Sequence, residues 1–80
     1  MKLYKRYVDV VALISKQSQI TPLFIVWDNN VKYPIDKILQ VKKAHSSVGG
    51  GGVMYLCKIQ NQRRKLYFER DRWFIESFTP

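Results

Sequence analysis

The clearest structural signal in this chain lies in residues 53–78, which read VMYLCKIQNQRRKLYFERDRWFIESF. Apolar side chains recur there at every second position, in short runs separated by polar residues. The predicted elements are a strand over 53–59, a turn at Asn61-Gln62-Arg63, a strand over 65–69, a turn at Arg70-Asp71 and a strand over 72–78. This order predicts a three-stranded antiparallel meander. In its last strand we expect Trp73 and Ile75 to be buried, with Phe74 on the other face beside Arg72 and Glu76.

Two further strands are predicted before this meander. Tyr7 to Ser15 is rich in β-branched residues and ends in a polar turn at 16–19, and Leu23 to Trp27 stops at the turn-forming residues 28–30. Both strands are apolar on both faces, whereas a strand with one face in water would alternate. Either another element covers their outer face, or that face is an association surface.

The segment from Val31 to His45 is open to two interpretations. Val31 to Tyr33 can return as a short strand, after which Pro34 fixes the chain direction and Asp36 could cap a single helical turn through Leu39. Alternatively, residues 39–44 alternate as another strand. A helix over 36–45 would split the apolar residues between two faces, so the pattern favours a turn followed by a strand.

All four glycines of the chain are consecutive, at positions 49–52. Such a run has high conformational entropy and no side chains to pack, so we expect a mobile loop. A phosphate-binding loop of the Walker type would need Gly-Lys-Ser/Thr, but Val53-Met54 follows here.

The fold class predicted from these segments is mainly β, with at most one short helical turn. We expect five to six strands in a small, strongly bent antiparallel sheet or a partly open barrel, because two full packed sheets would need more residues. A length of 80 residues predicts a single domain over 1–80.

Cysteine content and hydropathy bear on location. The single cysteine, Cys57, has no partner within the chain, which favours a reducing compartment and therefore the cytoplasm. The apolar run Val10 to Ile14 is too short to cross a membrane, so no membrane association is expected.

Catalytic groups are scarce in this sequence. His45, the one histidine, borders the glycine run, and Cys57 reads as a buried apolar residue in a strand. Six scattered carboxylates show no metal-ligand spacing. We therefore expect no enzymatic activity, no cofactor, no metal and no small-molecule ligand.

The charge balance suggests a polyanionic partner. Fourteen basic residues face six acidic ones, and the net charge of +8 attracts nucleic acid. The predicted nucleic-acid-binding residues are Arg63, Arg64, Lys65, Arg70, Arg72, Lys42, Lys43 and Tyr67. The two turns of a meander lie at opposite ends, so these residues need not form one patch.

Aromatic residues on a sheet face could stack on bases, and Tyr55, Tyr67 and Phe74 are candidates for this role. Burial in the core is the competing explanation for each of them. The leading prediction is a non-enzymatic accessory protein that contacts nucleic acid without sequence specificity. The alternative is a protein-interaction module, such as a homodimer, that buries the outer faces of Val8–Ile14 and Leu23–Trp27.

Scattered positions along nearly the whole chain also carry a resemblance. They are Thr21-Pro22, Trp27, Tyr33, Ile35-Asp36, Ile38-Leu39, Gly52, Tyr55, Cys57, Leu66-Tyr67 and Trp73-Phe74. In these the chain resembles a group of small proteins of Gram-positive bacteria that has no assigned activity. A subset of the same aromatic and aliphatic positions is similar to small β-proteins found beside translesion DNA polymerases, which would imply a DNA-repair setting.

Overall fold

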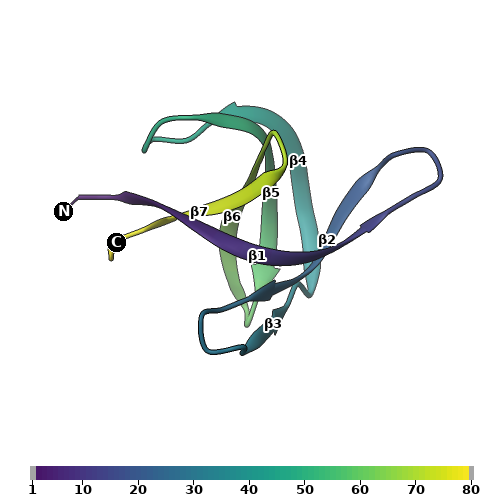
Figure 1. Cartoon of the computed structure of the whole chain (residues 1–80), viewed down its shortest axis with the longest axis horizontal. Helices are drawn as coiled ribbons and strands as arrows, with labels where there is room; N and C mark the ends of the chain where they lie inside the picture. The colour runs from purple at the N-terminus through teal and green to yellow at the C-terminus, as the bar shows by residue number, and fades with distance from the viewer. Residues whose placement is uncertain (1, 80) are drawn as a thin grey trace.

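The computed structural model describes residues 2–79, which form one antiparallel sheet without any helix (Figure 1). Its strands are β1 (Tyr4–Ile14), β2 (Ile20–Val26), β3 (Lys32–Pro34), β4 (Lys37–His45), β5 (Gly51–Ile59), β6 (Gln62–Glu69) and β7 (Arg72–Ser77). The prediction of a mainly β, strongly bent antiparallel sheet is confirmed. The predicted number of five to six strands is wrong, because there are seven.

The extra strand comes from the segment that the sequence left open. Residues 31–45 form both the short β3 and the long β4, so a turn followed by a strand is confirmed over a helix. Asp36 lies between them and caps no helical turn. Instead its backbone N–H donates to the carbonyl of Lys58 (2.9 Å), and its carboxylate accepts from the N–H of Gln60. These bonds join the β3–β4 connection to the end of β5.

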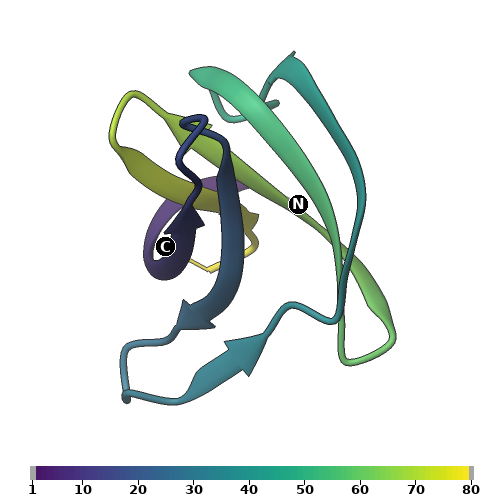
Figure 2. The same cartoon turned by 90° about the vertical axis from the view of Figure 1, so that its right-hand side faces the viewer.

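Strand β1 joins β2 and β3 to the part of the sheet that is formed by β4 to β7. Its first half pairs with β7 and its second half with β2, giving the order β3-β2-β1-β7-β6-β5-β4. A register shift between Val11 and Ala12 interrupts its pairing with β2. Bulges bend and twist strands, and Figure 2 shows the sheet curled around an interior, with β2 on one side and β5 on the other.

The concave side of this half-barrel holds the main core. Cys57, Leu66 and Trp73 are buried there and pack with Tyr55 and Ile25. The Tyr55 hydroxyl donates to the backbone carbonyl of Ile20 (2.8 Å), which ties β5 to the start of β2. The expected burial of Trp73 is confirmed.

A second, smaller cluster lies on the convex side, which we call the outer face. Met54, Tyr67 and Phe74 are buried there, on β5, β6 and β7. Phe74 shares this side of β7 with Arg72 and Glu76, because alternate residues of a strand point to the same face. Other residues must therefore shield these three side chains from solvent on the outer face.

The β5–β6 turn fixes which residues face each other. It consists of Gln60 and Asn61, both with positive φ (50° and 62°), one residue earlier than the predicted turn. Two positive φ values are typical of the tight two-residue hairpin turn that matches the twist of its strands. Ile59 therefore pairs with Gln62, and Lys58 with Arg63.

Candidate nucleic-acid interface

Three cations lie side by side across the sheet at the end near the β5–β6 turn. Lys37 on β4 is directly opposite Lys58 on β5, and Lys58 is directly opposite Arg63 on β6. Directly opposite residues share a face with their Cβ atoms about 5 Å apart, and like charges in such pairs are destabilising. Lys58 therefore has a cationic neighbour on each side, within the sheet.

Two more lysines extend this row on the same outer face. Lys65 lies two residues beyond Arg63 on β6, opposite Leu56, and Lys42 lies opposite Met54. The basic face consists of Lys37, Lys42, Lys58, Arg63 and Lys65, and all five side chains are exposed. Gln40 and Leu56, which lie between them, are uncharged. Cations thus gather on one side of β4, β5 and β6.

The seven basic residues among the predicted binding residues divide into three groups. Lys42, Arg63 and Lys65 belong to the basic face. Arg64 and Lys43 lie on the opposite side of the sheet, because their cross-strand partners, Cys57 and Val53, pack in the concave core.

Arg70 and Arg72 form the third group, at the β6–β7 turn and thus at the far end of the meander (Figure 1). Lys37 and Lys58 were not among the predicted binding residues. The register of the β5–β6 hairpin would have placed Lys58 beside Arg63, had the turn been assigned to Gln60-Asn61.

The aromatic candidates for base stacking are buried. Tyr67 is 3% exposed and its ring stacks on Phe74, with centroids 4.9 Å apart. Tyr55 and Phe74 are buried as well. Core packing explains all three rings, and the predicted contact of Tyr67 with nucleic acid, which stays a prediction, would need its ring to become exposed.

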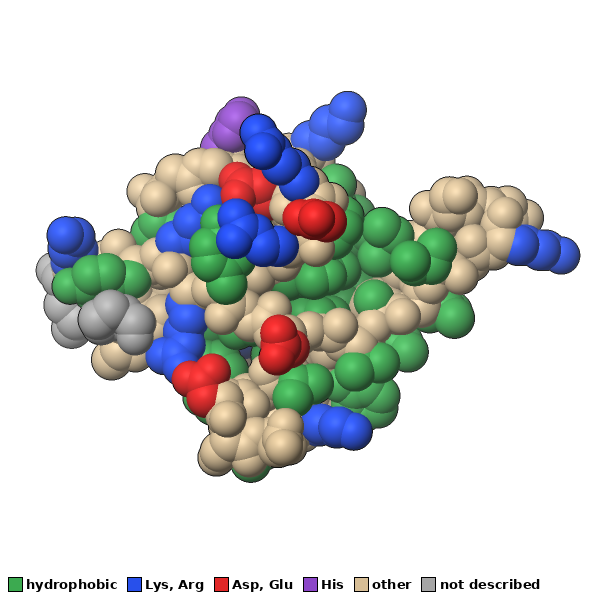
Figure 3. Space-filling model, viewed as in Figure 1, with side chains coloured by type: hydrophobic (Ala, Val, Ile, Leu, Met, Phe, Trp, Pro, Cys, Tyr) green, Lys and Arg blue, Asp and Glu red, His purple; other side chains and the backbone are tan. Residues whose placement is uncertain are grey.

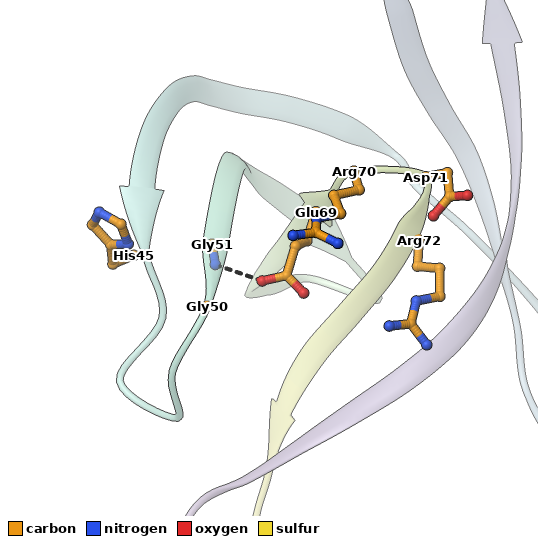
Figure 4. A pocket seen from close by; sticks show the side chains of 7 residues that line it. All are labelled: His45, Gly50, Gly51, Glu69, Arg70, Asp71 and Arg72. Atoms are coloured by element: carbon orange, nitrogen blue, oxygen red, sulfur yellow. Dashed lines mark hydrogen bonds between the residues drawn. The ribbon is translucent and has the colours of Figure 1, made fainter.

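The outer cluster is covered by the end of the β4–β5 hairpin, which we call the hairpin cover (residues 45–51). Ala44 and Val48 pack against the cluster. The carboxylate of Glu76 accepts hydrogen bonds from the Ser46 hydroxyl (2.9 Å) and from both the backbone N–H (2.9 Å) and the hydroxyl of Ser47. The carboxylate of Glu69 accepts from the N–H of Gly51 (2.9 Å), as the dashed line in Figure 4 marks.

Part of the glycine run that was expected to form a loop belongs to the sheet, because Gly51 and Gly52 lie in β5, whereas Gly49 has no neighbour within 4 Å of a Cβ atom. A Cβ atom at Gly50 would overlap the side chains of Glu69 and Lys5. One at Gly52 would overlap the backbone carbonyl of Phe68. The chain can approach β6 this closely because glycine has no side chain.

Both carboxylates that hold the cover favour the ionised form. The hydrogen bonds from Lys5 and from the Gly51 N–H hold the pKa of Glu69 below its usual value. Burial acts to raise the pKa of Glu76, but the hydrogen bonds from Ser47 and Ser46 outweigh it and lower that pKa. The ion pair with Glu69 (2.9 Å) in turn raises the pKa of Lys5.

A pocket at the β6–β7 end carries mixed charge (Figure 4). It is lined by His45, Gly50, Gly51, Glu69, Arg70, Asp71 and Arg72. The guanidinium of Arg72 lies 4.2 Å from the ring centroid of Tyr7 and donates to the Tyr7 hydroxyl. Because Glu69 and Asp71 share this pocket with the two arginines, it is less cationic than the basic face.

The groups considered for catalysis lie apart. His45 is exposed on β4, whereas Cys57 is completely buried, and burial raises the pKa of its thiol to about 11. Residues 2–79 contain no group of three or more side chains suited to hold a metal ion. They also form no helix long and apolar enough to cross a membrane.

The chain matches no family model, and comparisons with curated proteins and with solved structures find no match either. Both resemblances drawn from the sequence therefore stay predictions.

Proposed function

We propose that this protein is a non-enzymatic nucleic-acid-binding protein that contacts phosphates through the basic face. The observation that carries the proposal is Lys58, placed between Lys37 and Arg63 in the register of the sheet. Such an arrangement costs stability in the free protein. A polyanion lying across the row would offset the repulsion and release its own counterions.

The ordinary explanation of surface lysines accounts for only part of this face. β4 is an edge strand, and lysines on edge strands protect a sheet against pairing with another chain. That explanation covers Lys37 and Lys42. It does not cover Lys58, because β5 is paired with β4 on one side and with β6 on the other at this position. Arg63 lies in a part of β6 that pairs with β5 alone, since β6 pairs with β7 only over 67–69.

Binding through this face would carry little sequence specificity. Lysine and arginine contacts to phosphates position a protein on nucleic acid but do not read bases. Specific recognition needs donors and acceptors that reach base edges. The basic face offers cations from three adjacent strands and the uncharged Gln40 and Leu56 between them.

The experiment compares two charge reversals, Lys58→Glu and Arg64→Glu, by fluorescence anisotropy with a labelled oligonucleotide at about 0.15 M salt. Both variants change the net charge by the same amount, but Arg64 lies on the opposite side of β6. We expect Lys58→Glu to weaken binding strongly and to reduce the salt slope by about 1. Arg64→Glu should have a much smaller effect.

Equal losses in the two variants would show that only net charge matters and would remove the basic face from the proposal. Circular dichroism and thermal melting of both variants provide the control for folding. A DNA-repair setting, implied only by the second resemblance, is not needed for this test.

A protein-interaction module is the second candidate, and one observation favours it. On the outer side of β1 and β2, Val11, Leu13 and Phe24 are 43%, 57% and 36% exposed. Figure 3 shows hydrophobic side chains gathered beside the projecting β1–β2 hairpin. Sedimentation of the wild type and of Phe24→Lys tests self-association: a dimer lost in the variant would support it, and a monomer at high concentration would exclude it.

A further inference from the structure

Resting on the proposed function, we infer that the ligand of the basic face is double-stranded nucleic acid, held by its phosphate backbone, and not a single strand. The sequence alone left the strand form open. Three properties of the outer face favour the duplex: its buried rings, its convex shape and the spacing of its cations.

The first property is the burial of the rings that lie beside the basic face on β6 and β7. Proteins that bind single strands without sequence preference combine a basic groove with exposed aromatic rings, on which successive bases stack. Tyr67, which lies two residues beyond Lys65 on β6, and Phe74, its cross-strand partner on β7, are 3% and 0% exposed. They stack on each other beneath the hairpin cover.

Of the exposed rings, Phe24 lies on β2 and Phe78 follows β7, whereas Tyr7, at 42%, is the one that contacts the outer cluster through Phe74. The Arg72 guanidinium lies 4.2 Å from its ring centroid, and the Lys5 ammonium lies 5.3 Å from it. Its ring also meets Phe74 edge-on, with centroids 6.0 Å apart. A base would have to displace these cations in order to stack on Tyr7, so this ring is a poor platform.

The second property is curvature. The concave side of the half-barrel is filled by the core around Cys57, Leu66 and Trp73, and the cations lie on the convex side. A single strand is flexible, and a convex surface gives it no groove that fixes its path. A duplex is a stiff rod whose phosphates are already ordered, so it loses less conformational freedom on such a surface.

The third property is the density of charge. Neighbouring strands lie about 4.8 Å apart, so Lys37, Lys58 and Arg63 span about 10 Å across the sheet. A duplex carries one charge per about 1.7 Å of its axis, and each neutralised phosphate releases more counterion from a duplex than from a single strand. A row of cations that makes no base contacts therefore gains more from the duplex.

The experiment measures anisotropy at about 0.15 M salt with a labelled 20-base-pair duplex and with each of its separated strands. We expect the duplex to bind at least about ten-fold more tightly than either strand, because binding depends on charge density alone. Lys58→Glu should reduce duplex binding. Tyr7→Leu, which removes the exposed ring, should leave duplex binding within about two-fold of wild type.

The outcomes separate this inference from the proposal beneath it. Single strands that bind as tightly as the duplex, or a large loss of binding in Tyr7→Leu, would overturn the inference but leave nucleic-acid binding in place. No binding of either form at this salt concentration would overturn both. Duplex preference that Lys58→Glu does not weaken would overturn the assignment to the basic face.

Discussion

Lys58 has the most unfavourable position of the residues in the basic face, because both of its cross-strand neighbours are cations. It lies on a central strand with Lys37 on one side and Arg63 on the other. A directly opposite like-charge pair is destabilising, whereas an opposite-charge or neutral partner is not. A site selected for stability alone would not place three cations in one row.

This residue allows a test in which stability and binding move in opposite directions. Lys58→Gln removes the central charge, so we expect a free energy of unfolding higher by up to about 1 kcal/mol, with a small rise in Tm. The same variant should bind nucleic acid more weakly. Urea unfolding and anisotropy measure the two effects.

The matched control is Lys16→Gln, which makes the same chemical change at the exposed tip of the β1–β2 hairpin. We expect it to change neither stability nor binding appreciably. A Lys58→Gln protein that is less stable than wild type would contradict the claim of repulsion within the row.

Cys57 supplies a second prediction about a single side chain. It is fully buried, and burial raises its pKa to about 11, so the reactive thiolate is almost absent at neutral pH. We expect the native protein to resist a thiol reagent at pH 8, and the urea-unfolded protein to react at once. Rapid reaction of the native protein would reopen the case for a catalytic cysteine.

The hairpin cover is the element whose stability depends most clearly on pH. In the folded protein the pKa of Glu76 lies below its usual value of 4.5 because Ser46 and Ser47 donate to the ionised carboxylate. Its stabilising contribution is therefore fully present above pH 4.5 and is lost as the pH falls through the lowered value. Glu69 acts in the same direction.

We expect Glu76→Gln to be less stable than wild type at pH 7, and the difference to shrink as the pH falls below about 4.5. Asp9→Asn is the control. Asp9 is an exposed acid on β1, and its side chain forms no hydrogen bond with the other residues that the structure describes. Urea unfolding at pH 7 and at low pH measures the difference. A gap between wild type and Glu76→Gln that stays constant with pH would contradict the role of the carboxylate.

Sequence periodicity predicted the strands well, but it predicted the contacts between distant segments less well. The alternation in residues 53–78 was enough to predict the meander, because a strand with one buried face must alternate. The hairpin cover could not be predicted, because its contacts with Glu69 and Glu76 join residues 18 to 30 positions apart. Composition alone therefore suggested a loose loop.

The candidate site was predicted in part for a similar reason. Runs such as Arg63-Arg64-Lys65 look like one cluster in sequence, but alternate residues of a strand point to opposite faces. Only Arg63 and Lys65 of that run share the outer face with Lys42. Lys37 and Lys58 join them through pairing between strands, which depends on register and not on composition.

In the complete fold, the core and the basic face lie on opposite sides of the half-barrel. The concave side buries the core, the convex side carries the basic face, and the β1–β2 hairpin projects from the rest (Figure 1). The net charge of +8 would attract polyanions weakly wherever it lay. Binding through the basic face requires in addition that a defined set of phosphate contacts persists when salt screens the general attraction.

The salt dependence of duplex binding tests that claim most directly. Anisotropy titrations of the wild-type protein from about 0.05 to 0.3 M salt should give a linear fall of log K with log salt, with a slope of about −2.7 to −4.5 for three to five phosphate contacts. Binding should remain measurable at about 0.15 M. Binding that disappears by that concentration would contradict the account and reduce the charge to a general surface property.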